Sequence, residues 1–292
     1  IVRTIFPGTE HLISYHVVTE GACWGGLVGE APARLRTGDI IVFPHGDAHV
    51  MASAPGMRGT PELELYRRPA EGQLPFTLNM GQTRPDRAHI VCGFLGCDAR
   101  PFNPLVSALP RVIHVSERAG GVLQHFVQFA IAESRNPRPG GECVLGRLSE
   151  LMFVDVVRRY LETLPADRTG WLAGLREPFV GKALTALHRS PAREWTLEAL
   201  SREVGLSRSA LAERFTEYVG QPPMQYLTNW RMQLAASHLL AGNDAVASIA
   251  ERVGYESEAA FSRAFKKAVG TPPSQWRRRR AGGAMAPSMA SA

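Results

Sequence analysis

The first hundred residues contain five side chains of the types that bind metal ions or react with oxidants. They are His16, Cys23, His45, His49 and Cys92. Mixed histidine and thiolate ligands suit zinc or another borderline-soft ion, whereas an accessible thiol of lowered pKa reacts with oxidants. Hydrogen-bonded histidines and small buried thiols are the more common outcome for such residues. The sequence leaves these three alternatives open, with His49 and Cys92 as the first candidates for a metal ion.

A second group of candidate residues lies in a degenerate repeat near the C-terminus. Residues 200–223 and 249–273 each contain a short apolar helix, a glycine turn, a capping serine and a second helix. This order is typical of a helix-turn-helix, whose second helix enters the DNA major groove. Apolar residues recur every fourth position in that helix, so the side chains between them are expected to face bases. These base-reading candidates are Arg208, Ser209, Ala212, Glu213, Glu258, Ala259, Ser262 and Arg263.

The cations of the repeat indicate how DNA would be held. Arg263 is the candidate for a bidentate bond to guanine, which discriminates against other bases by roughly 1 to 3 kcal/mol. Phosphate contacts, which orient a protein without reading sequence, are expected from Thr216, Lys266, Lys267 and Arg277. The arginine run 277–280 is equally typical of a solvated tail. A plain helical bundle would need neither the paired glycine turns nor the serine caps.

The distribution of charge agrees with this interpretation. Residues 178–280 contain 15 Lys and Arg against 9 Asp and Glu, while the rest of the 292-residue chain balances at 18 against 18. A phosphate-binding module needs such an excess of positive charge. The 45% apolar composition is enough for two domains with their own cores.

Other features exclude several classes of protein. No apolar run approaches the roughly 18 residues of a membrane span, and no secretion signal is visible, so no membrane partner is expected. The four cysteines form no Cys-x-x-Cys pattern, which favours a reducing cytoplasm. No Gly-rich phosphate loop or catalytic signature occurs, and no motif requires a cofactor. The chain begins at Ile1, which indicates a non-standard start codon or residues upstream of this sequence.

An α+β fold is expected to position these residues. Short β-rich runs between Gly- and Pro-rich turns predict a small antiparallel barrel over residues 1–115. Helical periodicity predicts a helical hairpin over 116–164, a linker at 165–177, an all-helical double helix-turn-helix domain at 178–280 and a disordered tail at 281–292. Residues 223–240 are expected to form one helix roughly 25 Å long. Such a rod would hold the two recognition helices about one DNA turn apart.

One face of the second hairpin helix is apolar. It consists of Leu148, Leu151, Met152, Val156, Tyr160 and Leu164. This stripe could pack on the barrel of its own chain or on a second chain, because both arrangements bury the same surface. The sequence leaves internal packing and homodimer contact as alternatives.

The C-terminal repeat resembles the arabinose-operon regulator (AraC) class of bacterial transcription factors. The resemblance covers about residues 178–277 and rests on Trp195-Thr196, Pro222-Pro223, Trp230-Arg231-Met232, Val253-Gly254-Tyr255 and Phe261-Ser262-Arg263-Ala264-Phe265. It implies a cytoplasmic regulator that binds specific DNA sequences, usually an activator that contacts RNA polymerase. By position, the base contacts of the family fall on Ser209, Ala212, Glu213, Ala259, Ala260, Ser262 and Arg263.

Two of these positions depart from the family pattern. Relatives often have Arg or Gln where this chain has Ala212 and Glu213. A glutamate can accept a hydrogen bond from cytosine, but it also repels phosphate. The second recognition helix is therefore expected to supply more of the affinity than usual, or the first helix to read a different base.

The N-terminal half resembles cupins in one of their two motifs. Residues 38–49, GDIIVFPHGDAH, match the second motif, whose histidine is here His49 and often binds a metal ion in cupins. The first motif is absent, and one preserved ligand does not make a metal site. Cys92-Gly93-Phe94 resembles part of the sensor domain of one branch of the regulator class, and Pro104-Leu105 and Leu109-Pro110 extend that match. A member of that branch senses reactive chlorine by cysteine oxidation; Cys92 matches by position, while the pairing of Cys23 stays open.

Two functions follow from these observations. The first is a DNA-binding transcription regulator that responds to a small-molecule or redox signal in its N-terminal domain. The alternative is a cupin-type metal-dependent enzyme with a helical accessory domain. The missing first cupin motif argues against the enzyme, because catalysis would need the full set of metal ligands.

Overall fold

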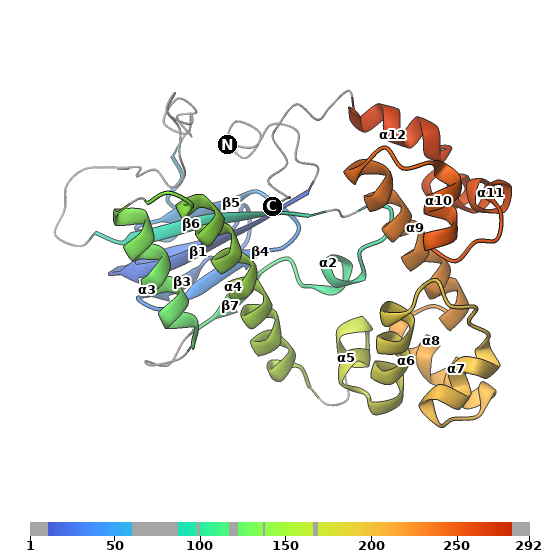
Figure 1. Cartoon of the computed structure of the whole chain (residues 1–292). Helices are drawn as coiled ribbons and strands as arrows, with labels where there is room; N and C mark the ends of the chain where they lie inside the picture. Colours follow the sequence, from blue (N-terminus) through green and yellow to red (C-terminus); the bar gives the residue numbers. More distant parts are fainter. Residues whose placement is uncertain are drawn as a thin grey trace. The chain divides into compact units, whose positions relative to one another are not determined.

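The structure, a computed structural model of the full chain, describes residues 11–59, 87–97, 100–116, 122–136, 138–165 and 169–281. Contacts divide the chain into two units, coloured along the sequence in Figure 1. The sheet unit comprises residues 1–97 and 110–163, and the helical unit comprises residues 98–109 and 164–292. The predicted tail, apart from residue 281, lies outside the described residues. No helix in the described part is long and apolar enough to cross a membrane.

The described strands of the sheet unit form two antiparallel sheets, ordered β6-β1-β4-β7 and β3-β2-β5. Apolar side chains from both sheets share one core, which includes Val18, Leu27, Leu35, Ile41 and Phe43. The predicted antiparallel fold is confirmed. The strands are β1 (His11–Glu20), β2 (Ala22–Leu27), β3 (Ala33–Arg36), β4 (Ile40–Phe43), β5 (His49–Ala52), β6 (His89–Cys97) and β7 (Ile113–Val115).

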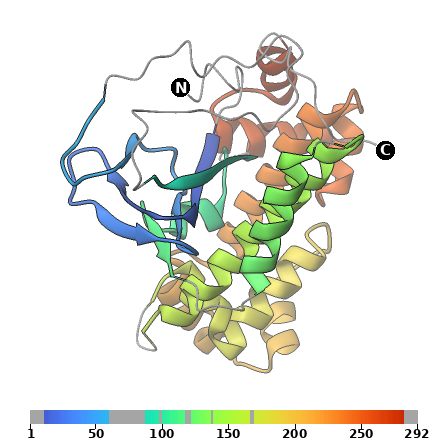
Figure 2. The same cartoon turned by 90° about the vertical axis from the view of Figure 1, so that its left-hand side faces the viewer.

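A helical hairpin covers the other face of the four-stranded sheet (Figure 2). It consists of α3 (Val122–Arg135) and α4 (Gly141–Thr163), as the sequence predicted. The Tyr15 hydroxyl donates to Ser149 Oγ at 2.6 Å, because the Ser149 hydroxyl itself donates to the Leu145 carbonyl. Tyr15 crosses over Gly93, its partner on β6, and a Cβ on Gly93 would overlap the tyrosine ring. Gly93 therefore leaves room for Tyr15 to tie the sheet to α4.

The apolar stripe of α4 is divided between two environments. Met152 and Val156 are 4% and 0% exposed, whereas Leu151 is 51% exposed. Leu151 lies about 100° around the helix from Met152 and faces away from the buried side of α4. The prediction of one continuous packing face is wrong at Leu151. Internal packing is confirmed for the buried positions, and the homodimer contact stays a prediction.

The helical unit contains two hydrophobic cores that share the long helix α9 (Figure 1). Tyr226 and Leu227 belong to the first core, and Met232 and Leu239 belong to the second. The predicted connecting helix is therefore confirmed. The helices are α2 (Pro104–Ala108), α5 (Trp171–Arg176), α6 (Pro178–Arg189), α7 (Leu197–Val204), α8 (Arg208–Val219), α9 (Pro223–Ala241), α10 (Val246–Arg252), α11 (Glu258–Val269) and α12 (Pro273–Ala281).

The predicted linker at 165–177 is wrong over its second half. Leu172 and Ala173 in α5 are 4% and 8% exposed, so this segment is part of the helical core. Its glycines suggested a flexible connection, but a Cβ on Gly174 would lie 3.2 Å from Val180 Cγ1. The glycine thus serves close packing between α5 and the start of α6.

The predicted barrel boundary at residue 115 is also wrong for one segment. Residues 100–109, which we call the strap, follow β6 in sequence but pack in the helical unit. The Phe102 ring meets the Tyr226 ring edge-on at 5.4 Å, and the Phe102 N–H donates to Gln233 Oε1 at 2.9 Å. Asn103 caps α2 by accepting from the Val106 N–H. Local sequence pattern could not assign the strap, because its partners lie more than 120 residues further along the chain.

Candidate nucleic-acid interface and thiol–imidazole cluster

The two helix-turn-helix copies are built by the same local contacts. Ser207 Oγ accepts from the Ala210 N–H at 3.2 Å, and Ser257 Oγ accepts from the Ala260 N–H at the same distance. These serines satisfy backbone donors that the first turn of a helix leaves free. In the preceding turn, Gly205 and Gly254 both have φ +81°, a conformation that favours glycine. The predicted caps and turns are confirmed.

Each recognition helix is anchored by two aromatic or aliphatic side chains. Leu211 and Phe215 hold α8, and Phe261 and Phe265 hold α11; all four are 0% exposed. The opposite faces carry the candidates for DNA contact. Arg208, Ser209, Glu213, Thr216, Glu258, Ala259, Arg263, Lys266 and Lys267 are exposed, whereas Ala212, Ala260 and Ser262 are partly buried.

The structure brings three of the predicted sensor residues together in the sheet unit. His16 on β1 lies opposite Cys92 on β6, and His16 Nδ1 is 2.9 Å from Cys92 Sγ. The other ring nitrogen, Nε2, is 2.8 Å from His49 Nε2. The His49 ring stacks on Phe43 at 4.0 Å. Cys92, His16 and His49 form a continuous chain, which we call the relay cluster.

Every hydrogen bond of the relay cluster is donated in the same direction, from Cys92 through His16 and His49 to the Asp47 carbonyl. His49 Nδ1 lies 2.9 Å from the Asp47 carbonyl, which can only accept, so Nδ1 carries the hydrogen. Neutral His49 then accepts at Nε2 from His16 Nε2–H. The remaining nitrogen of His16 accepts from the Cys92 thiol. This is the arrangement of neutral rings that satisfies all three contacts.

Burial keeps the members of the cluster uncharged. Desolvation, then the nearby His49, lowers the pKa of His16 to about 3. Desolvation raises the pKa of Cys92 to about 12, although one side of this residue is exposed to solvent, and Cys23 contributes in the same direction. Buried Cys23 has its pKa raised to about 11 by desolvation and by Asp39. Both cysteines are therefore thiols at neutral pH.

Comparisons with known proteins decide between the two functions left open. Residues 2–162 match a family model described as Cupin, and residues 200–279 match one described as Helix-turn-helix domain. An AraC-like transcription regulator of Streptomyces lividans is 35% identical over 91% of this chain and 87% of its own length. The chain is an AraC-like transcription regulator.

Other relatives of this AraC-like regulator carry similar names. The RCS-specific HTH-type transcriptional activator RclR of Escherichia coli strain K12 is 25% identical over 93% of this chain and 86% of its own length. The DNA-binding domain of AdpA, solved in complex with a target DNA, is 25% identical over 37% of this chain and 98% of its own, with a TM-score of 0.35. The helix-turn-helix domain and the regulator names of the sequence relatives show a DNA-binding regulator and give the enzyme alternative no support.

The relay cluster of the AraC-like regulator does not fit a metal ion. His16 is bonded to His49 through Nε2 and to Cys92 through Nδ1, which lie on opposite sides of the ring. In this arrangement one ion could not bind both His16 Nε2 and Cys92 Sγ. The described residues contain no group of three His, Cys, Asp or Glu arranged to hold an ion. His45 occupies the turn after β4, four residues before His49.

Arg277 differs from the free phosphate-binding side chain that the sequence suggested. It is partly buried, and its Nη2 donates to the Asp244 carbonyl at 2.6 Å. Asp244 lies between α9 and α10, so Arg277 fastens α12 to that loop. Its contact with phosphate stays a prediction, and Lys266 and Lys267 are better placed because both are exposed.

Sequence reasoning missed a polar network inside the first helical core. Trp171 Nε1–H donates to the Tyr226 hydroxyl at 2.9 Å, and His188 Nε2 is hydrogen-bonded to the same oxygen at 2.7 Å. Desolvation lowers the pKa of His188 to about 4 and keeps the ring neutral. The Trp230 ring stacks on His188 at 4.2 Å. Trp230 in the family motif was the available signal, but its partners come from other helices.

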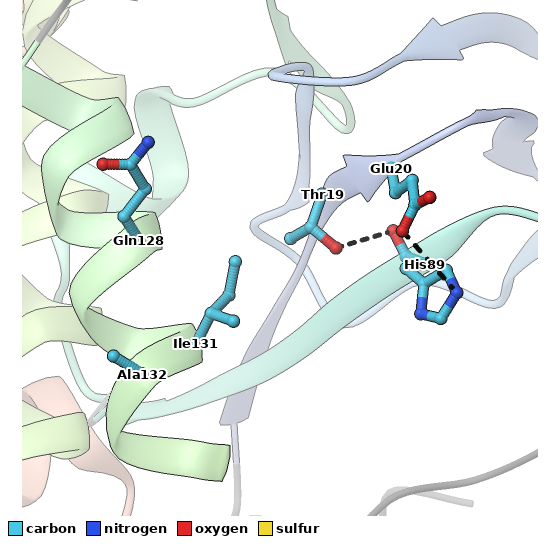
Figure 3. A pocket seen from close by; sticks show the side chains of 6 residues that line it. All are labelled: Thr19, Glu20, His89, Gln128, Ile131 and Ala132. Carbon is cyan, nitrogen blue, oxygen red and sulfur yellow. Dashed lines mark hydrogen bonds and ion pairs between the residues drawn. The ribbon is translucent and has the colours of Figure 1, made fainter.

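A cavity of about 310 Å³ lies between the end of the four-stranded sheet and α3 (Figure 3). It is lined by Thr19, Glu20, His89, Gln128, Ile131 and Ala132. The Thr19 hydroxyl donates to the His89 carbonyl at 3.1 Å, and the His89 ring lies 3.8 Å from the Glu20 carboxylate. None of the five candidate sensor residues lines it.

Proposed function

We propose that this regulator acts in the cytoplasm and docks α8 and α11 in two successive major-groove segments on one face of double-stranded DNA. The proposal rests on two helices with matching caps, each anchored by fully buried side chains and each exposing a polar face. The 19 residues of α9 correspond to a rod roughly 28 Å long. That length is comparable with the roughly 34 Å between successive major-groove segments on one face.

Two substitutions on α11 test the roles of its exposed cations. Arg263→Ala is expected to weaken binding to the preferred DNA by roughly 1 to 3 kcal/mol and to relax the preference at one base position. Lys266→Ala is expected to weaken all sequences alike and to reduce the slope of affinity against salt by about one. Selection from random DNA, followed by anisotropy titrations at several salt concentrations, measures both effects.

The two variants control for each other, since each removes one positive charge from the same helix. Equal base preferences for Arg263→Ala and the wild type would remove Arg263 from base reading. A footprint confined to a single groove segment would contradict the two-segment proposal.

We propose that the signal acts on the thiol of Cys92, with Cys23 as the second thiol. An E. coli relative is described as an RCS-specific activator, and Cys92 is exposed and hydrogen-bonded to His16. The raised pKa of the Cys92 thiol slows its reaction, because the thiolate is the nucleophile, so the proposal rests on access and on the relative. Two thiols and one molecule of hypochlorous acid give a disulfide, water, chloride and a proton. The two sulfurs lose the two electrons that reduce the chlorine. No metal ion or other cofactor takes part in this step.

Replacing Cys92 with serine is expected to abolish the effect of hypochlorous acid on DNA binding. Serine retains a hydrogen-bond donor toward His16 but cannot form a disulfide. The measurement is the change in DNA affinity after stoichiometric oxidant, with mass spectrometry of the thiols. Cys143→Ser is the matched control, because Cys143 is exposed on α4 and outside the relay cluster. An unchanged oxidant response in Cys92→Ser would exclude Cys92, and small-molecule effectors would become the alternative.

We further propose an activator that contacts RNA polymerase and works as a homodimer. Phe129, Leu151 and Val154 on the helical hairpin are 49%, 51% and 46% exposed, so this hairpin offers apolar surface to a second chain. Sedimentation of the wild type and of Leu151→Glu tests the dimer, and a monomeric wild type at micromolar concentration would overturn it.

A further inference from the structure

The orientation of the two helix-turn-helix copies depends on what joins them, because their cores are separate. The first core contains Val180, Leu200 and Phe215, and the second contains Ile249 and Phe265. Helix α9 contributes to both. Each core packs on its own stretch of α9, so the relative rotation of the two copies depends on the part of the helix between the cores keeping its shape. Additional contacts at the middle of α9 would therefore restrict bending and twisting there and hold the rotation at one value.

Arg231 lies at this junction on α9 and is partly buried. Its Nε donates to the Pro191 carbonyl at 2.8 Å, and its Nη2 donates to the Arg193 carbonyl at 2.9 Å. Its Nη1 donates to the Gly254 carbonyl at 3.2 Å. One planar guanidinium thus binds the loop before α7 and the turn before α11 at the same time.

The two segments that Arg231 joins are each fixed to a different core. In the loop before α7, the Arg193 guanidinium stacks on Trp195 at 4.0 Å, and Trp195 is 7% exposed in the first core. In the turn before α11, the Tyr255 ring meets Phe261 of the second core at 5.6 Å. Movement of one copy relative to the other would therefore break bonds to Arg231.

Gly254 shows that the loop and the turn are in direct contact. A Cβ on Gly254 would lie 2.6 Å from the Ala192 carbonyl oxygen and 2.8 Å from Arg231 Nη2. The glycine is therefore required for its positive φ and also for this close approach. The two helix-turn-helix copies therefore contact each other at Gly254 and Ala192, and the hydrogen bonds of Arg231 hold this contact together.

We propose that Arg231 is a positioning residue that sets the spacing and rotation of α8 relative to α11, and hence the operator spacing that this regulator accepts. The inference rests on the proposed two-segment contact with DNA. Lysine could replace Arg231 only in part, because an ammonium is a compact point charge and lacks the planar set of donors that reaches three carbonyls.

The test uses the full chain and the DNA that the wild type selects from a random pool. One or two base pairs are inserted or deleted between the two contacted segments; each step moves a segment by about 3.4 Å and turns it by about 34°. The wild type is expected to lose about a hundredfold in affinity, because the second segment can no longer be engaged. Arg231→Met is expected to bind the best operator about tenfold more weakly, since preorganisation is lost. Its discrimination against altered spacing should fall below about fivefold.

Arg252→Met is the matched control, because it removes one exposed cation that pairs with Asp244 on the surface of the second copy. It should retain wild-type discrimination between spacings. Base preferences within each segment should be unchanged in Arg231→Met, since the recognition helices keep their own cores.

Three results would count against the inference. Retained spacing discrimination in Arg231→Met, with affinity lowered equally on every operator, would make Arg231 merely structural. Global unfolding of Arg231→Met by circular dichroism would also overturn it, because neither core contains Arg231. A wild-type footprint on one segment alone would overturn the proposed function, and this inference with it. Arg231→Lys, expected to lie between Arg231→Met and the wild type, repeats the test with the charge retained.

Discussion

Gly93→Ala is expected to destabilise the sheet unit by about 2 to 4 kcal/mol, from forced overlap and a lost hydrogen bond. The new Cβ would overlap the Tyr15 ring, and the ring could move only by giving up its bond to Ser149. Sheet and α4 would then lose a direct connection. Hydrogen exchange read by mass spectrometry, peptide by peptide, measures the loss of protection in β1, β6 and α4.

The helical unit serves as the internal control for this experiment, since Gly93 belongs to the sheet unit. Tyr15 is 7% exposed, so Tyr15→Ala destabilises the sheet unit by itself. Gly93→Ala should cost less in the Tyr15→Ala background than in the wild type, because the overlapping ring is absent there. Wild-type protection in Gly93→Ala would show that the ring and glycine do not depend on each other.

Phe102→Ala is expected to destabilise the helical unit by about 2 to 3 kcal/mol, a value below that for a fully buried phenylalanine because Phe102 is partly exposed. The substitution removes an edge-on contact with Tyr226, which is itself 0% exposed. The hydrogen bond from the backbone N–H of residue 102 to Gln233 Oε1 would also be weakened. Chemical denaturation followed by tryptophan fluorescence and by exchange in α9 measures the effect.

Ser107→Ala is the control, because Ser107 is an exposed residue of the same strap. It should leave stability within about 0.5 kcal/mol of the wild type, as for most surface substitutions. A Phe102→Ala variant that loses protection in the sheet unit, but not in α9, would show that the strap belongs with the sheets.

Local pattern in the sequence was sufficient to predict the elements that we propose contact DNA. Ser207 and Ser257 cap their helices, and Gly205 and Gly254 adopt positive φ, because these features depend on a few neighbouring residues. The four-residue spacing of Phe261 and Phe265 likewise marked the buried face of α11. The departures concern partners distant in sequence. Residues 165–177 were expected to form a linker, yet α5 within this range packs in a core.

By itself, the sequence determined the α+β class, the duplicated helix-turn-helix and the family, since caps, turns and helical periodicity are encoded within a few residues. Only the tertiary structure decided that Cys92 bonds to His16, that the strap packs beside Tyr226, and that Arg231 joins three carbonyls. Each of these contacts joins segments 23 to 124 residues apart, as the numbering shows. Such contacts depend on how whole elements pack, and no local spacing of residue types specifies that packing.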